Sequence, residues 1–126
     1  MNDGNTSTKH AYQAFGFVFH SELPLPGMHR APNDKPAVVV IRCGDVPEHL
    51  DDVVARGAAF EASSNQLLLT VPNVARYLVQ NGDEIVIQPE PNATESDLRA
   101  FLTSSAFGAL LHQRGVLPMH ASGGEV

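Results

Sequence analysis

A single helix is the strongest constraint in this 126-residue sequence. Residues 94–97 (TESD) have the form of a capping box, in which a hydroxyl accepts from the third amide and a carboxylate turns back toward the first. Arg114 in the last turn, Gly115 and then Pro118 are typical of a helix end. Apolar residues cover more than one stripe of the segment, so its second half should be buried nearly all round. Residues 94–114 are therefore the predicted core helix.

Short apolar runs precede this helix and predict a sheet. Aromatic residues alternate from Tyr12 to His20 with the period of one strand that has an apolar face. A β-branched run over 37–42 predicts a second strand. Further strands are expected at 59–62, 66–71, 74–80 and 84–88, and Asn81-Gly82-Asp83 is a strong hairpin signal between the last two. The fold class is therefore α+β, with an antiparallel or mixed sheet of several short strands and one long C-terminal core helix.

Proline and glycine mark the breaks between these elements. Pro24 and Pro26 make residues 21–27 an extended segment that cannot sit inside a sheet. Residues 46–55 are consistent with two turns of helix that start at Pro47 and stop at Gly57.

The two ends of the chain differ from its middle. Residues 1–10 are small and polar and are predicted to be a flexible leader, so that one domain spans 11–116. After the helix, Gly123-Gly124 has the form of a hairpin turn, yet only two residues follow it. We therefore expect residues 117–126 to be the start of a further element that the chain does not complete.

Charge and cysteine content exclude several classes of partner. Eight basic against fourteen acidic residues give a net charge of −6, which is a poor basis for nucleic-acid binding. Cys43 is the single cysteine, so no internal disulfide can form and a reducing cytoplasm fits best. The longest uncharged apolar stretch is shorter than the roughly 18–20 residues of a membrane span. We expect a cytoplasmic protein without nucleic-acid or membrane partners.

Common catalytic signatures are missing from the sequence. It contains no phosphate loop of the Walker type, no Gly-x-Gly-x-x-Gly opening a helix after a strand and no Gly-x-Ser-x-Gly elbow. Asp51 and Asp52 are adjacent carboxylates, but neighbouring positions do not face one another, which favours a solvated surface over shared-proton chemistry.

Histidine remains the residue to weigh for acid–base chemistry. Three histidines in polar surroundings are expected at the surface: His10, His29 and His49. His20 ends the aromatic run and is a candidate to line a groove, while His112 suits the negative end of the helix dipole; a structural role is favoured for both. His120 follows an apolar run at a point where the chain is expected to turn back, and it is the catalytic candidate. The sequence pattern around it, taken without any family resemblance, favours a structural role.

Four blocks of the sequence carry a resemblance to a known family. They are SELPLP at 21–26, VPNVARYLV at 71–79, SAFGALLHQRG at 105–115 and LPMHAS at 117–122. Over residues 12–122 the chain resembles proteins related to HPr serine kinase. In that family such a region precedes a kinase domain with a glycine-rich phosphate loop, a lysine for the nucleotide phosphates and an aspartate that acts as base on the substrate serine. The resemblance implies that residues 117–126 are the start of a P-loop kinase domain, whose core is absent from this sequence.

The resemblance implies a role for one residue. His120 matches the histidine that the family places just before its phosphate loop, and the implied role is to assist phosphoryl transfer to a serine hydroxyl. ATP and Mg²⁺ are implied for the complete protein, whereas this chain is expected to hold no cofactor. The implied partners are the C-terminal kinase domain and a protein or peptide that carries a serine, and homo-oligomerisation is left open.

Two functions follow from these observations. In the first, the chain is the N-terminal part of an HPr serine kinase-like protein, inactive alone, which packs against the catalytic domain or presents the substrate. It predicts an exposed apolar patch formed by the incomplete hairpin and the C-terminal half of the helix. The alternative is a complete non-catalytic module that adds a peptide strand to a sheet edge, with residues 23–26 shaping the groove.

Overall fold

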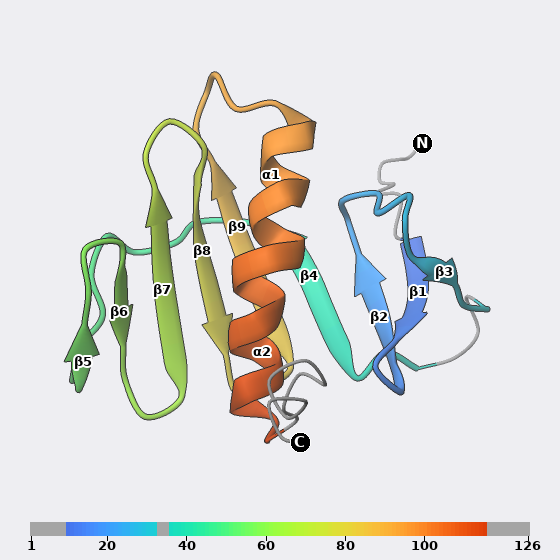
Figure 1. The fold of residues 1–126 in the computed structure, drawn as a ribbon, viewed down its shortest axis with the longest axis horizontal. Helices are drawn as coiled ribbons and strands as arrows, with labels where there is room; N and C mark the ends of the chain where they lie inside the picture. The colour runs from blue at the N-terminus through green and yellow to red at the C-terminus, as the bar shows by residue number, and fades with distance from the viewer. Residues whose placement is uncertain (1–9, 33–35, 116–126) are drawn as a thin grey trace, which may run out of the picture.

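The computed structural model describes residues 10–32 and 36–115, which form one mixed sheet and one C-terminal helix (Figure 1). The helix has three continuous parts, which are α1 (Glu95–Phe101), a π-helical turn η1 (Leu102–Ala106) and α2 (Phe107–Gln113). The strands are β1 (His10–Ala14), β2 (Phe17–Ser21), β3 (His29–Arg30), β4 (Val39–Cys43), β5 (Ala55–Arg56), β6 (Phe60–Ala62), β7 (Gln66–Val71), β8 (Ala75–Gln80) and β9 (Glu84–Pro89). The predicted combination of a mixed sheet with a C-terminal core helix is confirmed.

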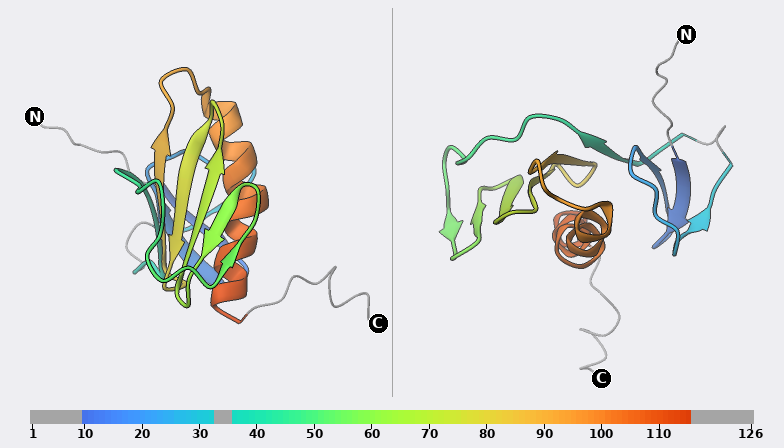
Figure 2. Two further views of the ribbon diagram at one scale, coloured as in Figure 1. Left: turned by 90° about the vertical axis from the view of Figure 1, so that its left-hand side faces the viewer. Right: turned by 90° about the horizontal axis from the view of Figure 1, so that it is seen from above.

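The nine strands are arranged in the order β3-β1-β2-β4-β9-β8-β7-β6-β5. The pairs β2–β4 and β4–β9 are parallel, and the other pairs are antiparallel. After β4 the chain crosses the sheet on the face opposite the helix, reaches β5 at the far edge and returns through the β5–β9 meander (Figure 2). We call residues 44–54 the strap. The sheet thus has the helix on one face and the strap on the other.

The predicted single strand from Tyr12 to His20 is wrong, because the chain turns back in its middle. Phe15 and Gly16 both have positive φ angles, of 55° and 82°, which is what a two-residue hairpin turn of type I′ requires. The turn joins β1 to β2 and places Tyr12 opposite Phe19. A bulky residue such as Phe is unusual at positive φ, so the apolar alternation concealed this turn.

The predicted helix over 46–55 is also wrong. The strap has no regular secondary structure, and Asp52 within it has a φ of 55°. Val46 is buried against Leu68, Leu78 and Val86, and together they form a small core cluster on the strap face. A short helix is stable only when an amphipathic face packs against the rest of the protein. In the strap, the single side chain of Val46 makes the buried apolar contact instead.

The other predicted strands and the predicted helix agree with the structure to within two residues. The predicted leader lies outside the described residues except for His10, which begins β1. The strand predicted at 66–71 is β7 itself, and the hairpin signal at Asn81-Gly82 gives positive φ angles of 58° and 67°. Thr94 caps the helix through its Oγ1, which accepts from the Asp97 amide at 3.1 Å. The π-helical turn was not predicted.

The hydroxyls of Thr103 and Ser104 accompany this π-helical turn. Thr103 donates to the carbonyl of Arg99 at 2.9 Å, and Ser104 donates to that of Ala100 at 2.7 Å. Such bonds from hydroxyl side chains to the preceding turn compete with the regular backbone ladder and bend helices. The turn therefore lies where two hydroxyl residues follow one another.

The main core lies between the helix and the sheet. Phe19 of β2 stacks on Phe107 of α2, with ring centroids 5.3 Å apart. Tyr77 of β8 donates its hydroxyl to the carbonyl of Leu98 at 2.9 Å, and burial raises the pKa of Tyr77 to about 12, which keeps that proton in place. The segment after β2 joins this core, because Leu25 is buried and its amide donates to the hydroxyl of Tyr12 at 2.7 Å.

Removal of each tyrosine hydroxyl should give unequal losses of stability. Tyr12→Phe leaves the buried amide of Leu25 without a partner and should lower the free energy of unfolding by about 1–3 kcal/mol. Tyr77→Phe should cost less, about 1 kcal/mol, because the carbonyl of Leu98 still accepts from the Leu102 amide. Chemical denaturation of both variants measures the difference, and equal losses would contradict this account of the segment after β2.

Candidate functional site

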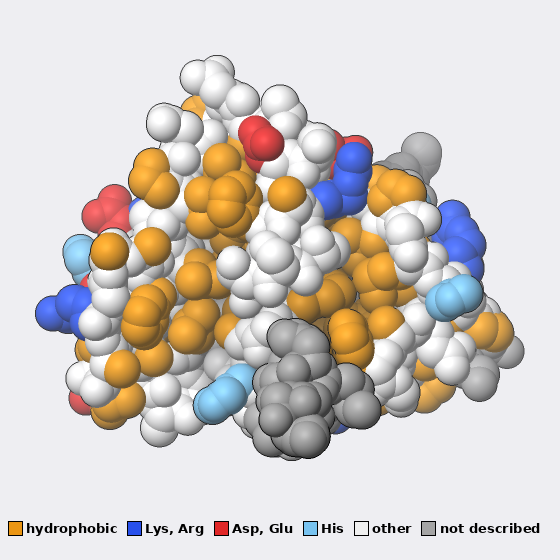
Figure 3. All heavy atoms as spheres, viewed as in Figure 1, with side chains coloured by type: hydrophobic (Ala, Val, Ile, Leu, Met, Phe, Trp, Pro, Cys, Tyr) orange, Lys and Arg blue, Asp and Glu red, His pale blue; other side chains and the backbone are white. Residues whose placement is uncertain are grey.

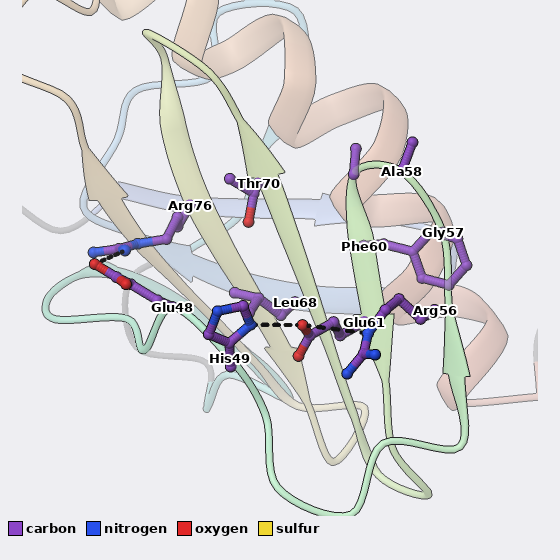
Figure 4. Close-up of a pocket in the computed structure, with 11 residues that line it drawn as sticks. Glu48, His49, Arg56, Gly57, Ala58, Phe60, Glu61, Leu68, Thr70 and Arg76 are labelled. Atoms are coloured by element: carbon purple, nitrogen blue, oxygen red, sulfur yellow. Dashed lines mark hydrogen bonds and ion pairs between the residues drawn. The ribbon is translucent and has the colours of Figure 1, made fainter.

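A cleft of about 640 Å³ lies between the strap and the far half of the sheet (Figure 4). Its walls come from the strap, from β5 and β6 with their connecting turn, and from the faces of β7 and β8 that the helix does not cover. The lining residues are Glu48, His49, Arg56, Gly57, Ala58, Ala59, Phe60, Glu61, Leu68, Thr70 and Arg76. The cleft gathers cationic, acidic and apolar side chains in one place.

Glu61 of β6 holds the strap over this cleft. Glu61 is only 8% exposed and lies opposite Leu68, on the strap face of the sheet. One carboxylate oxygen accepts from the Leu50 amide at 2.8 Å, and the other lies 2.7 Å from Nδ1 of His49. These two bonds, with a smaller contribution from Arg56, lower the pKa of Glu61 below its ordinary value of 4.5. The carboxylate is therefore ionised near neutral pH and ties the strap to the sheet.

The bond to Glu61 fixes the orientation and tautomer of His49. An ionised carboxylate can only accept, so Nδ1 of His49 carries the proton and Nε2 is the nitrogen left free to accept another. The side chain of His49 is 78% exposed. The pair is therefore an exposed imidazole held in place by a buried carboxylate.

Two arginines of the cleft have weak partners. Arg76 of β8 is 20% exposed, and its nearest ion-pair contact, to Glu48, is 3.5 Å long. Nε of Arg76 is buried and has no hydrogen-bond partner. Arg56 of β5 contacts Glu61 at 3.6 Å. Both contacts exceed the usual length of a charge-assisted hydrogen bond, so most of the donor capacity of the two guanidinium groups remains unused within the described part of the chain.

A second feature lies at the end of the helix, where Gln113 and Arg114 bind the β8–β9 turn. Gln113 donates to the carbonyl of Val79 and accepts from the Gly82 amide, both at 2.9 Å. Arg114 donates to the carbonyl of Gly82 at 2.7 Å, and its guanidinium carbon lies 4.3 Å from the centre of the Phe17 ring. We call this set of contacts the helix-end clamp. It fixes the end of α2 to both halves of the sheet.

The sequence-predicted site residue, His120, lies outside the described residues, as do the other residues of 117–126. His29, His49 and His112 are exposed, but His49 also forms the bond to Glu61 in the cleft. Asp51 and Asp52 are both exposed, as predicted. Sequence reasoning missed Glu61, for which the only signal is one charged residue in a short apolar strand.

The segment 23–26, expected to shape a groove at a sheet edge, is divided between the core and the surface, since Pro24 and Pro26 line a small hollow with Arg30 of the edge strand β3. Leu23 and Leu25 are buried, and Leu25 lines a hollow beside the helix with Met28 and Thr103. The two edges of the sheet are β3 and β5, each of two residues. Edge strands this short are poor templates for an added strand.

The three family-like blocks within the described chain meet in one core cluster. Leu25 belongs to the first block, Tyr77 and Val79 to the second, and Phe107 and Leu110 to the third, and all five are buried together. These blocks therefore contribute to core packing, and the third also supplies Gln113 and Arg114 of the helix-end clamp.

The described residues carry few other pointers to function. Residues 10–32 and 36–115 include no group of three or more His, Cys, Asp or Glu that could hold a metal ion. None of the helices in these ranges has the length and apolar character needed to cross a membrane. Comparison of the chain with protein-family models, curated proteins and solved structures gives no match.

Strap attachment should depend on pH through Glu61. Because the folded-state pKa of Glu61 is lowered, its contribution to stability is present above pH 4.5 and is lost as the pH falls through the lower, folded value. Glu61→Gln should therefore destabilise the protein at pH 7 and flatten the loss of stability in acid. Amide exchange at Leu50 reports the strap directly and should quicken in this variant. Glu90→Gln, on an exposed carboxylate, is the matched control; equal effects of the two changes would contradict the assignment.

Proposed function

We propose that this chain is the N-terminal portion of an HPr serine kinase-like protein, whose complete form transfers a phosphoryl group from ATP to a serine of a protein or peptide. The chain itself would pack against the catalytic domain and help to present the substrate. The proposal rests first on the family resemblance of its sequence blocks. The structural observation that supports it best is the helix-end clamp.

The helix-end clamp sets the direction in which the chain leaves the domain. Gln113 and Arg114 hold the last turn of α2 through three hydrogen bonds to Val79 and Gly82, and a stacked guanidinium adds a fourth contact. Gly115 then has a φ of 77°, the left-handed conformation that ends a helix. Under this proposal, the fixed helix end has the role of positioning the catalytic segment, to which the resemblance assigns His120. Phosphoryl transfer depends mainly on such positioning.

Apolar side chains beside the helix supply a surface for packing. Leu67, Leu69 and Val71 of β7 face the helix side of the sheet but are only partly buried, and Phe60 lies opposite Leu69. Figure 3 shows hydrophobic side chains gathered over β6 and β7 on this face. The predicted source of such a patch was wrong in part, since Phe107, Leu110 and Leu111 in the second half of the helix are buried. The strands next to the helix carry the exposed apolar area instead.

The first test is nucleotide binding by the 126-residue chain. Calorimetric titration with Mg-ATP should give no saturable heat at micromolar concentrations, because the proposal places the nucleotide site outside this sequence. Micromolar binding would overturn the proposal.

The second test uses the protein encoded by the complete reading frame that contains this chain. Gln113→Ala should release the helix end from the β8–β9 turn and lower the rate of phosphoryl transfer to the serine substrate by about tenfold to a hundredfold. Arg99→Ala is the control on the same helix, since the guanidinium of Arg99 pairs only with Glu95 within residues 10–32 and 36–115. Circular dichroism should show that both variants remain folded. Equal rates for the two variants would show that the helix-end clamp does not position the catalytic segment.

A further inference from the structure

We infer that the cleft under the strap binds an oxyanion, a carboxylate or phosphate group, carried on an apolar body. The inference concerns a different face of the molecule from the helix-end clamp, and it does not depend on the proposed kinase function. It rests on three features of the cleft, which are unused cationic donors, a replaceable internal carboxylate and an apolar floor.

The unused donors are concentrated in this cleft. Among the six arginines, three donate hydrogen bonds to a carboxylate or carbonyl: Arg42, Arg99 and Arg114. Arg30 is exposed and lies over the ring of Tyr12. The other two, Arg56 and Arg76, both line the cleft, and among the residues that the structure describes they have only the long contacts at 3.6 and 3.5 Å. A guanidinium group presents a planar fork of donors that matches the oxygens of a carboxylate or phosphate.

Burial makes Arg76 the stronger of these two cationic sites. A mostly buried charged group without a hydrogen bond is costly, so each such group in a folded protein requires an explanation. Arg114 also has a buried Nε without a partner, but its guanidinium is satisfied by a carbonyl and a ring. Arg76 has neither of these. Its β7 neighbour in register is Thr70, whose exposed side chain lines the same cleft.

Glu48 is the carboxylate that a ligand would replace. Its side chain is 78% exposed, it comes from the irregular strap, and its one ion-pair contact is the 3.5 Å approach to Arg76. An incoming oxyanion that forms shorter bonds to Arg76 can therefore displace Glu48 into solvent at little cost. Glu61 does not compete in the same way, because both of its oxygens already accept from His49 and Leu50.

The floor and outer wall of the cleft are apolar. Leu68 is 1% exposed at the floor, and Ala58, Ala59 and Phe60 form the wall at the β5–β6 turn (Figure 4). Gly57 allows this wall to close, since a Cβ at that position would lie 2.2 Å from the ring of Phe60. A ligand with a compact apolar part beside its oxyanion matches this arrangement better than a free ion does.

Titration followed by amide NMR tests the inference with three probes: N-acetyl-leucine, its neutral amide and inorganic phosphate. The acid should cause saturable shifts at the amides of Leu50, Thr70 and Arg76, with a dissociation constant on the order of 1 mM. The neutral amide should not. Saturation by the acid alone assigns the carboxylate on an apolar body, and saturation by phosphate as well assigns a general oxyanion site. Absence of saturation with both anions, or equal binding of acid and amide, would overturn the inference.

Variants of the cleft should change the affinity in opposite directions. Arg76→Gln should weaken binding about tenfold, and Glu48→Gln should strengthen it, because the first removes the cation and the second removes the competing carboxylate. Arg30→Gln is the control, since Arg30 lies at the opposite edge of the sheet. If Arg76→Gln does not fold, the affinities of Glu48→Gln and Arg56→Gln test the inference instead, because both of these side chains are exposed and their replacement should leave the fold intact. Tighter binding in Arg76→Gln, or weaker binding in Glu48→Gln, would contradict the assignment.

Discussion

A nine-stranded sheet with one helix must bury two apolar faces, and this constraint shapes the rest of the molecule. Strand β8 has apolar side chains on both faces of the sheet. Tyr77 and Val79 point to the helix, while Leu78 points to the opposite face, which the helix does not cover. The helix covers the first face only over the central strands. The strap must cover the second, and eleven residues without regular structure have few means of attachment.

The strap solves this by combining an apolar anchor at Val46 with polar contacts, of which the carboxylate of Glu61 makes two. Val46 fills the cluster with Leu68, Leu78 and Val86 near the centre of the sheet. Further out, where the strands shorten, the strap is held by the carboxylate of Glu61 through the Leu50 amide and His49. A single buried carboxylate with two short bonds replaces the apolar contact that a helix would have made. The dependence of the strap on a carboxylate makes this side of the fold sensitive to acid, whereas the hydrogen bonds described between the helix and the sheet involve no carboxylate.

The sequence predicts the elements that local signals specify. Thr94 and Gly115 mark the helix because capping requires particular side chains and backbone angles, and Asn81-Gly82 marks its hairpin for the same reason. The Phe15-Gly16 turn was missed because Phe carries no turn signal and its apolar neighbours continue the strand period on both sides. The strap was mistaken for a helix because its conformation depends on contacts with β6, β8 and β9, which are distant in sequence or follow it.

The candidate cleft shows the same limit more strongly. Glu61, Thr70 and Arg76 come from three different strands. In the sequence, each of them has the pattern of an ordinary polar residue on a solvated face. Only the register of β6, β7 and β8 places them on one face, and only the path of the strap encloses them. Had a helix crossed this face, the polar side chains would have been buried without partners or replaced by apolar ones. Because an irregular strap crosses it instead, the space between its contacts with the sheet stays open, and the charged residues of β5 and β8 can keep donors for a molecule from outside.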